Sequence, residues 1–284
     1  MTRSPTEGVH VDAHAVPLSL SYHTVPELSP PQMVQVASDA GCRFIGLRLL
    51  HGQPGRDLAP LMLDAALRRE TMACLRATGI EVLDASGARL TPATDMSAFA
   101  PFIATAAEMG ARHILATGDD GDEPRLVAHF AELCEAAQRS RLTVDLEFVP
   151  WMTVRDVPTA ARIVRAVGSP NFGIAVDALH FDRSGSSLAD LAALPRPWFR
   201  YVQLCDAPQD WSNDRDALYH AAVKERLFPG DGAIDLVGLL RALPRGMPIA
   251  LEIPMATLAQ TVPAAERVRR AVAATRRVVA AAYG

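Results

Sequence analysis

Short apolar runs alternate along the chain with longer segments that have the period or the propensity of helices. Runs of this kind are typical of parallel β-strands that are buried on both faces. Strands are expected at 17–22, 43–50, 80–85, 112–118, 142–148, 172–176, 199–205 and 248–253. A turn or helix signal follows each run, so the pattern predicts repeated strand–helix units.

The intervening segments carry helix start and stop signals. The first helix is expected to begin after Ser29, with Pro30 at its first position, and to end at Gly41. Helices are expected at Pro30–Ala40, Leu61–Thr78, Met96–Met109, Glu123–Ser140, Val154–Val167, Ser187–Leu194, Ile234–Leu243 and 262–282. The connection at 207–233 is expected to be a long loop, and its length favours a functional lid.

Eight strand–helix units in 284 residues predict an α/β protein with a single (β/α)₈ TIM barrel. The barrel is expected at 16–284, after a flexible N-terminal arm at 1–15. A doubly wound open sheet is the alternative, but no Gly-rich phosphate-binding fingerprint follows any of the predicted strands.

Composition narrows the class of protein. Apolar residues make up 49% of the chain and charged residues 21%, which is enough for a sizeable core. A net charge of −4 argues against nucleic acid or an anionic membrane as the partner. The four cysteines are scattered, with no CxxC pair, and are expected to be reduced. With no signal peptide or spanning segment apparent, we expect a cytoplasmic protein with a small-molecule substrate; a homo-oligomer is compatible with the sequence.

Four polar residues stand near the ends of four consecutive predicted strands. They are Glu147, Asp177, Gln203 and Glu252. The carboxyl ends of the strands of a parallel barrel meet at one face, so these side chains are expected to converge there. Three carboxylates and one amide oxygen form an oxygen-rich set of ligands that suits Mg²⁺ or Mn²⁺.

The chain resembles the xylose-isomerase-like TIM-barrel superfamily of sugar phosphate isomerases and epimerases. The resemblance covers most of the chain, and its most specific segments are LEF, VDALH, VQLCDA, ERLFPGDGAID and LEI. It implies that one Mn²⁺ or Mg²⁺ is bound by Glu147, Asp177, Gln203 and Glu252. Gln203 departs from the histidine of the sugar ketose epimerases and is similar to the glutamine of bacterial 3-dehydroshikimate dehydratases. An amide oxygen also favours Mg²⁺ or Mn²⁺ over zinc.

Other residues are candidates for substrate binding. The resemblance implies that His180, three residues after Asp177, faces the substrate; a structural histidine is the alternative. Arg226 is expected to clamp a carboxylate, a phosphate or a pair of hydroxyls, although a surface arginine in a loop would read similarly. Further candidates at the same face are Tyr22, His23, Arg48 and His51. Asp206, and in the same way Asp84, is expected either to orient a ligand from behind or to cap a loop.

The resulting hypothesis is a metal-dependent enzyme that removes a proton beside a carbonyl. The metal would stabilise the enediolate, with Glu147 or Glu252 as the base and the other returning a proton. Proton return to the neighbouring carbon gives an isomerase, and return to the opposite face gives an epimerase, acting on a sugar or sugar acid. Loss of a β-hydroxyl gives the alternative, a 3-dehydroshikimate dehydratase-like lyase. An endonuclease IV-like DNA repair enzyme and a non-catalytic binding barrel are the remaining readings.

Overall fold

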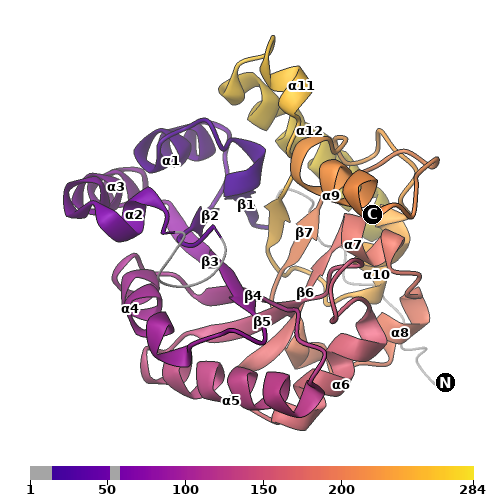
Figure 1. Cartoon of the computed structure of the whole chain (residues 1–284). Helices are drawn as coiled ribbons and strands as arrows, with labels where there is room; N and C mark the ends of the chain where they lie inside the picture. Colours follow the sequence, from indigo (N-terminus) through magenta and orange to yellow (C-terminus); the bar gives the residue numbers. More distant parts are fainter. Residues whose placement is uncertain (1–14, 52–57) are drawn as a thin grey trace, which may run out of the picture.

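The computed structural model describes residues 15–51 and 58–284 of the chain, so all of the expected N-terminal arm but Ala15 lies outside the described residues. Eight parallel strands close into a barrel in chain order, and β1 pairs with β8. The strands are β1 (Leu18–Ser21), β2 (Phe44–Arg48), β3 (Glu81–Leu90), β4 (His113–Gly118), β5 (Thr143–Glu147), β6 (Phe172–Asp177), β7 (Val202–Leu204) and β8 (Ile249–Leu251). The predicted (β/α)₈ barrel is confirmed (Figure 1).

Helices surround the ring of strands (Figure 1). The α-helices are α1 (Pro30–Asp39), α2 (Pro60–Leu63), α3 (Ala65–Thr78), α4 (Ala100–Glu108), α5 (Glu123–Arg139), α6 (Val157–Val167), α7 (Ala178–Arg183), α8 (Leu188–Ala192), α9 (Arg215–Lys224), α10 (Leu236–Ala242), α11 (Ala256–Ala259) and α12 (Ala264–Tyr283). Three 3-10 helices complete the described elements: η1 (Tyr22–Thr24), η2 (Met96–Phe99) and η3 (Arg196–Trp198).

The predicted helix Leu61–Thr78 is divided at Asp64. The Asp64 carboxylate accepts hydrogen bonds from the backbone N–H groups of Ala66 and Leu67, at 2.8 and 3.0 Å. Asp64 therefore acts as the N-cap of α3, and its extended backbone ends α2 one residue earlier. The predicted helix Met96–Met109 is likewise built from η2 followed by α4.

Strand β3 is longer than the predicted 80–85. Its pairing with β4 shifts register between Ser86 and Ala88, which indicates a bulge at Gly87. Gly87 has a φ of 111°, and a Cβ atom there would lie 2.0 Å from the carbonyl oxygen of Leu50. Only glycine fits this approach, and the strand continues beyond it to Leu90.

The prediction of an unstructured loop at 207–233 was wrong, because α9 lies within it. The Asp214 carboxylate caps this helix by accepting hydrogen bonds from the N–H groups of Asp216 and Ala217. Ala222 is the one α9 residue that is buried. A helix with so little buried surface lacks the strong apolar periodicity on which the other helix predictions rested.

Apolar side chains fill the interior of the barrel. A cluster separate from the main core is formed by Phe44, Leu83, Leu115, Ala175, Tyr201 and Ala250. Leu115 also lines the large cavity above this cluster. All four cysteines are free, as the sequence predicted, and in the described parts of the chain no helix is both long and apolar enough to cross a membrane.

Candidate metal centre and substrate cavity

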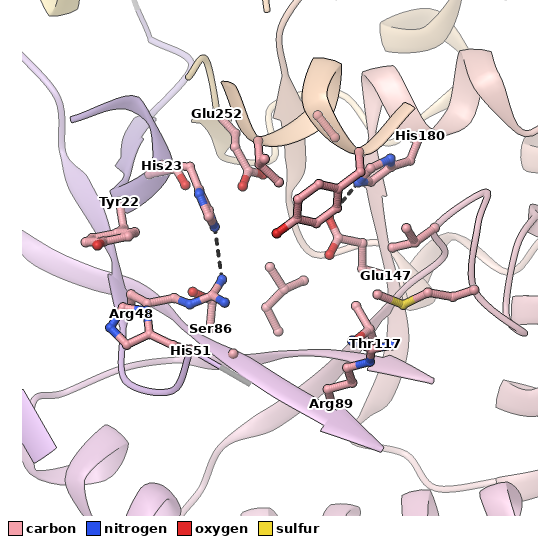
Figure 2. Close-up of a pocket in the computed structure, with 18 of the residues that line it drawn as sticks. Tyr22, His23, Arg48, His51, Ser86, Arg89, Thr117, Glu147, His180 and Glu252 are labelled. Atoms are coloured by element: carbon pink, nitrogen blue, oxygen red, sulfur yellow. Dashed lines mark hydrogen bonds and ion pairs between the residues drawn. The ribbon is translucent and has the colours of Figure 1, made fainter. Parts of the chain in front are cut away.

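A cavity of about 520 Å³ opens at the carboxyl end of the barrel strands. Its walls come from β1 to β5, from the segment after β8 and from α9. Figure 2 shows Glu147 and His180 on one side of this cavity, His23 and Arg48 on the other, and Glu252 next to His23. The volume is in the range of a site for one small organic molecule.

The carboxylates expected as metal ligands converge at one side of this cavity. Glu147 ends β5 and Asp177 ends β6, while Glu252 directly follows β8. Asp177 is completely buried, and Glu252 is 6% exposed. Ligand atoms of Glu147, Asp177 and His180 all lie within 4.8 Å of one another, which is close enough for one ion.

Arg226 contacts two of the residues that are expected to bind metal, Asp177 and Glu252. Its Nη1 donates to Oδ2 of Asp177 at 2.5 Å and to the backbone carbonyl of Glu252 at 3.2 Å. Its Nε donates to the carbonyl of Ala222 in α9, at 2.9 Å. Arg226 is 4% exposed and still lines the cavity. This arginine therefore joins the ends of β6 and β8 to the α9 segment.

Gln203 lies in β7 beside Asp177, its partner in the strand register. The Nε2 of Gln203 donates to Oε2 of Glu252, so two of the expected ligands are in contact. The other amide atom, Oε1, is buried and has no hydrogen-bond partner in the described part of the chain. A buried oxygen without a donor is rare in folded proteins, and a hard cation would satisfy it.

His180 is placed by the first turn of α7. Its backbone N–H donates to Oδ1 of Asp177, at 2.9 Å, so Asp177 caps the helix that presents His180. The His180 Nε2 lies 4.0 Å from Oε1 of Glu147, and its Nδ1 is buried without a hydrogen-bond partner. The sequence suggested His180 as a substrate contact; its position also puts an imidazole nitrogen within reach of the carboxylates.

This donor set fits a divalent metal ion. Glu147, Asp177 and His180 bring ligand atoms within 4.8 Å of one another, and Gln203, which contacts Glu252, adds a buried amide oxygen without a partner among the described residues. Carboxylate and amide oxygens are ligands of hard divalent cations, whereas an imidazole extends the range to zinc and iron.

Burial and mutual repulsion alter the protonation of these groups. Burial raises the pKa of Glu252 to about 7, and burial together with the charges of Glu252 and Asp177 holds the pKa of Glu147 well above its ordinary value. Burial also acts to raise the pKa of Asp177, but Arg226 outweighs it and the pKa falls below its usual value. Burial lowers the pKa of His180 to about 4, which leaves the ring neutral near pH 7.

The expected substrate contacts Tyr22, His23, Arg48 and His51 line the same cavity. The Tyr22 ring meets the His23 ring edge-on at 5.5 Å and the His51 ring at 6.3 Å. Arg48 Nη1 lies 2.9 Å from Nε2 of His23 (Figure 2). All four residues therefore lie at the face of the barrel where the sequence predicted them.

The two aspartates with open roles differ in position. The Asp206 carboxylate accepts hydrogen bonds from the backbone N–H groups of Ala207, Gly230 and Ile234, at 2.8 to 3.0 Å. These bonds hold the loop that follows Arg226, as the loop-capping alternative predicted. Asp84 lines the cavity floor, where burial raises its pKa to about 8.

Several lining residues were missed by sequence reasoning. They are Ser86, Arg89, Thr117, Arg215 and Lys224, among others. Arg89 was missed because β3 was expected to end at Ala85, before the bulge. The glycine inside a strand-like run was the available signal for that bulge. The α9 residues were missed because the helix was expected to be a loop.

Comparison with known proteins places the chain in a family. The profile described as "Xylose isomerase-like TIM barrel" matches residues 34–278. The chain belongs to the xylose isomerase-like TIM barrel family. The resemblance read from the sequence is thereby confirmed.

Curated relatives match over a shorter stretch. The inosose isomerase of Halalkalibacterium halodurans is 34% identical over 117 residues, which are 39% of this chain and 38% of that protein. The inosose isomerase of Bacillus subtilis is 31% identical over 114 residues, or 39% of each chain. The chain thus matches well under half the length of these relatives.

Solved structures share the fold over almost the whole chain. The IolI protein, described with a bound zinc atom, has a TM-score of 0.77 at 21% identity and covers 93% of this chain and 98% of its own. The probable 3-DHS dehydratase AsbF of Bacillus anthracis has a TM-score of 0.70 at 18% identity, over 90% of this chain and 97% of its own. At these identities the likeness concerns the fold alone.

Proposed function

We propose that this protein is a divalent-metal-dependent isomerase or epimerase of a sugar or sugar acid. The convergence of Glu147, Asp177 and His180 within 4.8 Å, beside Glu252 in a small-molecule cavity, carries the proposal. The ligands would be Glu147, Asp177, Gln203 and Glu252, and the amide oxygen of Gln203 favours Mn²⁺ or Mg²⁺. When bound, the ion would polarise a carbonyl and stabilise negative charge on its oxygen.

Glu147 and Glu252 are the proposed proton-transfer groups. They project from β5 and from the end of β8, so they approach a bound molecule from different parts of the ring. One would accept the proton from the carbon beside the carbonyl, and the other would return a proton to the opposite face or to the neighbouring carbon. Neutral His180 and the Arg226 guanidinium would hold substrate oxygens in place.

The names of the curated relatives support an isomerase, since both are inosose isomerases. Inososes are polyhydroxylated cyclic ketones, which have the acidic C–H bond beside a carbonyl that this chemistry requires. The matched stretch is short, so ketoses, inososes and keto acids are all proposed as substrates to test.

The deciding experiment is exchange of substrate hydrogen with solvent. The protein is stripped of metal, reloaded with Mn²⁺ or Mg²⁺ and incubated in D₂O with ketoses and inososes, and deuterium incorporation is followed by NMR. We expect metal-dependent exchange beside the carbonyl with a rearranged or epimerised product, and much slower exchange in Glu252→Gln. Absence of exchange from every substrate by a metal-loaded protein would contradict the proposal.

A 3-dehydroshikimate dehydratase-like lyase is the second candidate. Gln203 favours it through the resemblance described above, and Arg48 offers a guanidinium to an acidic substrate. The same proton abstraction followed by loss of a hydroxyl would give a product that absorbs in the ultraviolet. Metal-dependent absorbance from 3-dehydroshikimate, without turnover of ketoses, would assign the lyase activity instead.

We also propose a cytoplasmic location, where the four free cysteines would remain reduced. Fractionation of the native host, probed with an antibody against this chain, tests this directly. Recovery with extracellular or envelope proteins would refute it.

A further inference from the structure

Arg48 differs from Arg226 and Arg89, two other arginines that face the cavity. Arg226 is paired with Asp177 at 2.5 Å, and Arg89 forms an ion pair with Asp119. Within the described part of the chain, no carboxylate lies within 4.0 Å of the Arg48 guanidinium, and its Nε is buried without a hydrogen-bond partner. Arg48 is thus a largely enclosed cation with no carboxylate in contact with it among residues 15–51 and 58–284.

His23 fixes the orientation of Arg48 without neutralising it. Its Nε2 lies 2.9 Å from Nη1 of Arg48. Burial, followed by the nearby positive charge of Arg48, lowers the pKa of His23 to about 3, so the ring is neutral and can accept a hydrogen bond from Arg48. Because Nε is enclosed by protein atoms and only one N–H of Nη1 is engaged by His23, the Nη1–Nη2 edge is left for a ligand.

That free edge has the geometry of a carboxylate site. Two parallel N–H groups on one side of a planar guanidinium match the two oxygens of a carboxylate and bind them bidentately. A buried charge without a partner is costly, and an anion that is desolvated together with it relieves that cost. The charges of Glu252 and Glu147 act to raise the pKa of Arg48, but neither carboxylate contacts the guanidinium.

Charges at the cavity mouth have the same sign as Arg48. Arg215 and Lys224 are exposed residues of α9 that line the cavity. The chain as a whole carries a net charge of −4, so this positive wall is a local feature. Such a wall raises the local concentration of anions and speeds their entry.

We propose that Arg48 binds a carboxylate of the substrate, which makes the substrate class a sugar acid rather than a neutral sugar. This inference rests on the proposed function. Arg48 sets the specificity, and His23 positions its guanidinium. The carboxylate would lie beside Arg48, and the reacting carbonyl would lie toward Glu147, which Figure 2 shows across the cavity from Arg48.

Calorimetric titration with matched sugars tests the inference. The probes are D-glucuronate against D-glucose and D-galacturonate against D-galactose, with D-glucose 6-phosphate as a different anion. The protein is used both loaded with Mn²⁺ and metal-free. Arg48→Gln removes the charge, and Arg48→Lys keeps it without the planar fork. Arg43→Gln is the matched control, because Arg43 precedes the same strand at the opposite end of the barrel and is exposed.

We expect each uronate to bind about tenfold to a hundredfold more tightly than its neutral sugar. Arg48→Gln should remove this preference, because the affinity for the uronate falls by that factor more than the affinity for the neutral sugar, which makes no bond between opposite charges there. Arg48→Lys should keep part of the preference, and Arg43→Gln all of it. Circular dichroism checks that both Arg48 variants are folded, and if Arg48→Gln is not, Arg48→Lys alone decides.

The opposite results are equally clear. Equal affinity within each pair, no binding of any of the four sugars, or tighter binding of the phosphate ester would overturn the inference. A preference for the uronate that persists in Arg48→Gln but is lost in the metal-free protein would show that the ion binds the carboxylate. That result would also overturn the inference. Deuterium exchange separates this result from the proposed function: exchange of neutral ketoses without acid preference sinks only the carboxylate site, whereas uronate binding at Arg48 without exchange sinks only the isomerase.

Discussion

Arg226 and Asp177 form a buried ion pair, with 2.5 Å between Nη1 of the arginine and Oδ2 of the aspartate. The side chains are 3% and 0% exposed, so neither charge is solvated by bulk water. The pair links the end of β6 to the segment after α9, 49 residues away in sequence. Arg226 lowers the pKa of Asp177 and so keeps its carboxylate ionised. The pKa values of Glu147 and Glu252 are raised instead.

Replacement of Arg226 by methionine should destabilise the protein strongly. Removal of one partner from a buried ion pair leaves the other charge unpaired, which costs about 3–5 kcal/mol. The control is Arg162→Met, which breaks an exposed ion pair with Glu123 and should cost less than about 1 kcal/mol. Urea unfolding of the metal-free proteins gives both values. Similar losses for the two variants would show that the buried pair has no special weight.

Replacement of Glu147 or Glu252 should slow proton transfer. Glu147→Gln and Glu252→Gln each remove a proton acceptor of the proposed reaction, so the rate of solvent exchange should fall about 10²- to 10⁴-fold. Single-turnover kinetics and metal analysis of each variant distinguish a lost base from a lost ligand. A variant that retains its metal and exchanges protons at the wild-type rate would exclude that glutamate from the chemistry.

Gln203 should influence which metal is bound. Gln203→His replaces an amide oxygen by an imidazole nitrogen, which is a better ligand for zinc. We expect the ratio of zinc to manganese affinity to rise by at least about tenfold in competition experiments read by elemental analysis. Gln203→Glu, which retains an oxygen ligand, is the control and should not favour zinc. An unchanged ratio in Gln203→His would place Gln203 outside the coordination sphere.

Asp84 should make the metal-free protein less stable at alkaline pH. Its pKa rises from the ordinary 3.8 to about 8 on folding, so its contribution is complete below about pH 4 and is lost as pH rises through about 8. Each unit of pKa difference corresponds to about 1.4 kcal/mol. Urea unfolding at pH 5 and pH 9 should show a smaller change for Asp84→Asn than for wild type. Asp39→Asn, at the exposed end of α1, should behave as wild type.

The strands and the metal side of the cavity were accessible to sequence reasoning for a simple physical reason. Parallel strands in a barrel are buried on both faces, so β5, β6 and β8 stand out as apolar runs. A polar residue at the end of such a run is conspicuous. Glu147, Asp177 and Glu252 were found in this way. The closed barrel brings Glu147 and Glu252 to the same cavity and buries Asp177 beside Glu147.

The remaining features depend on chain paths that local patterns do not encode. The contact between Arg226 and Asp177 follows from the route of a long segment over the barrel, so the sequence gives no spacing from which to infer it. Arg89 reaches the cavity because of the bulge at Gly87, where strand periodicity changes. Whether a carboxylate contacts Arg48 depends on all the segments that pack around it, so the sequence alone does not predict it.

Helix α9 borders two cavities while burying a single residue of its own. Arg215, Tyr219 and Lys224 line the large cavity, and Leu218 and Ala221 line a second one of about 270 Å³. Substitutions on this helix therefore alter which molecules can enter the barrel, with little effect on the stability of the folded core. Natural variation in α9 can retune substrate choice while the strand-end chemistry stays intact, which makes this helix the natural target for redesigning the protein.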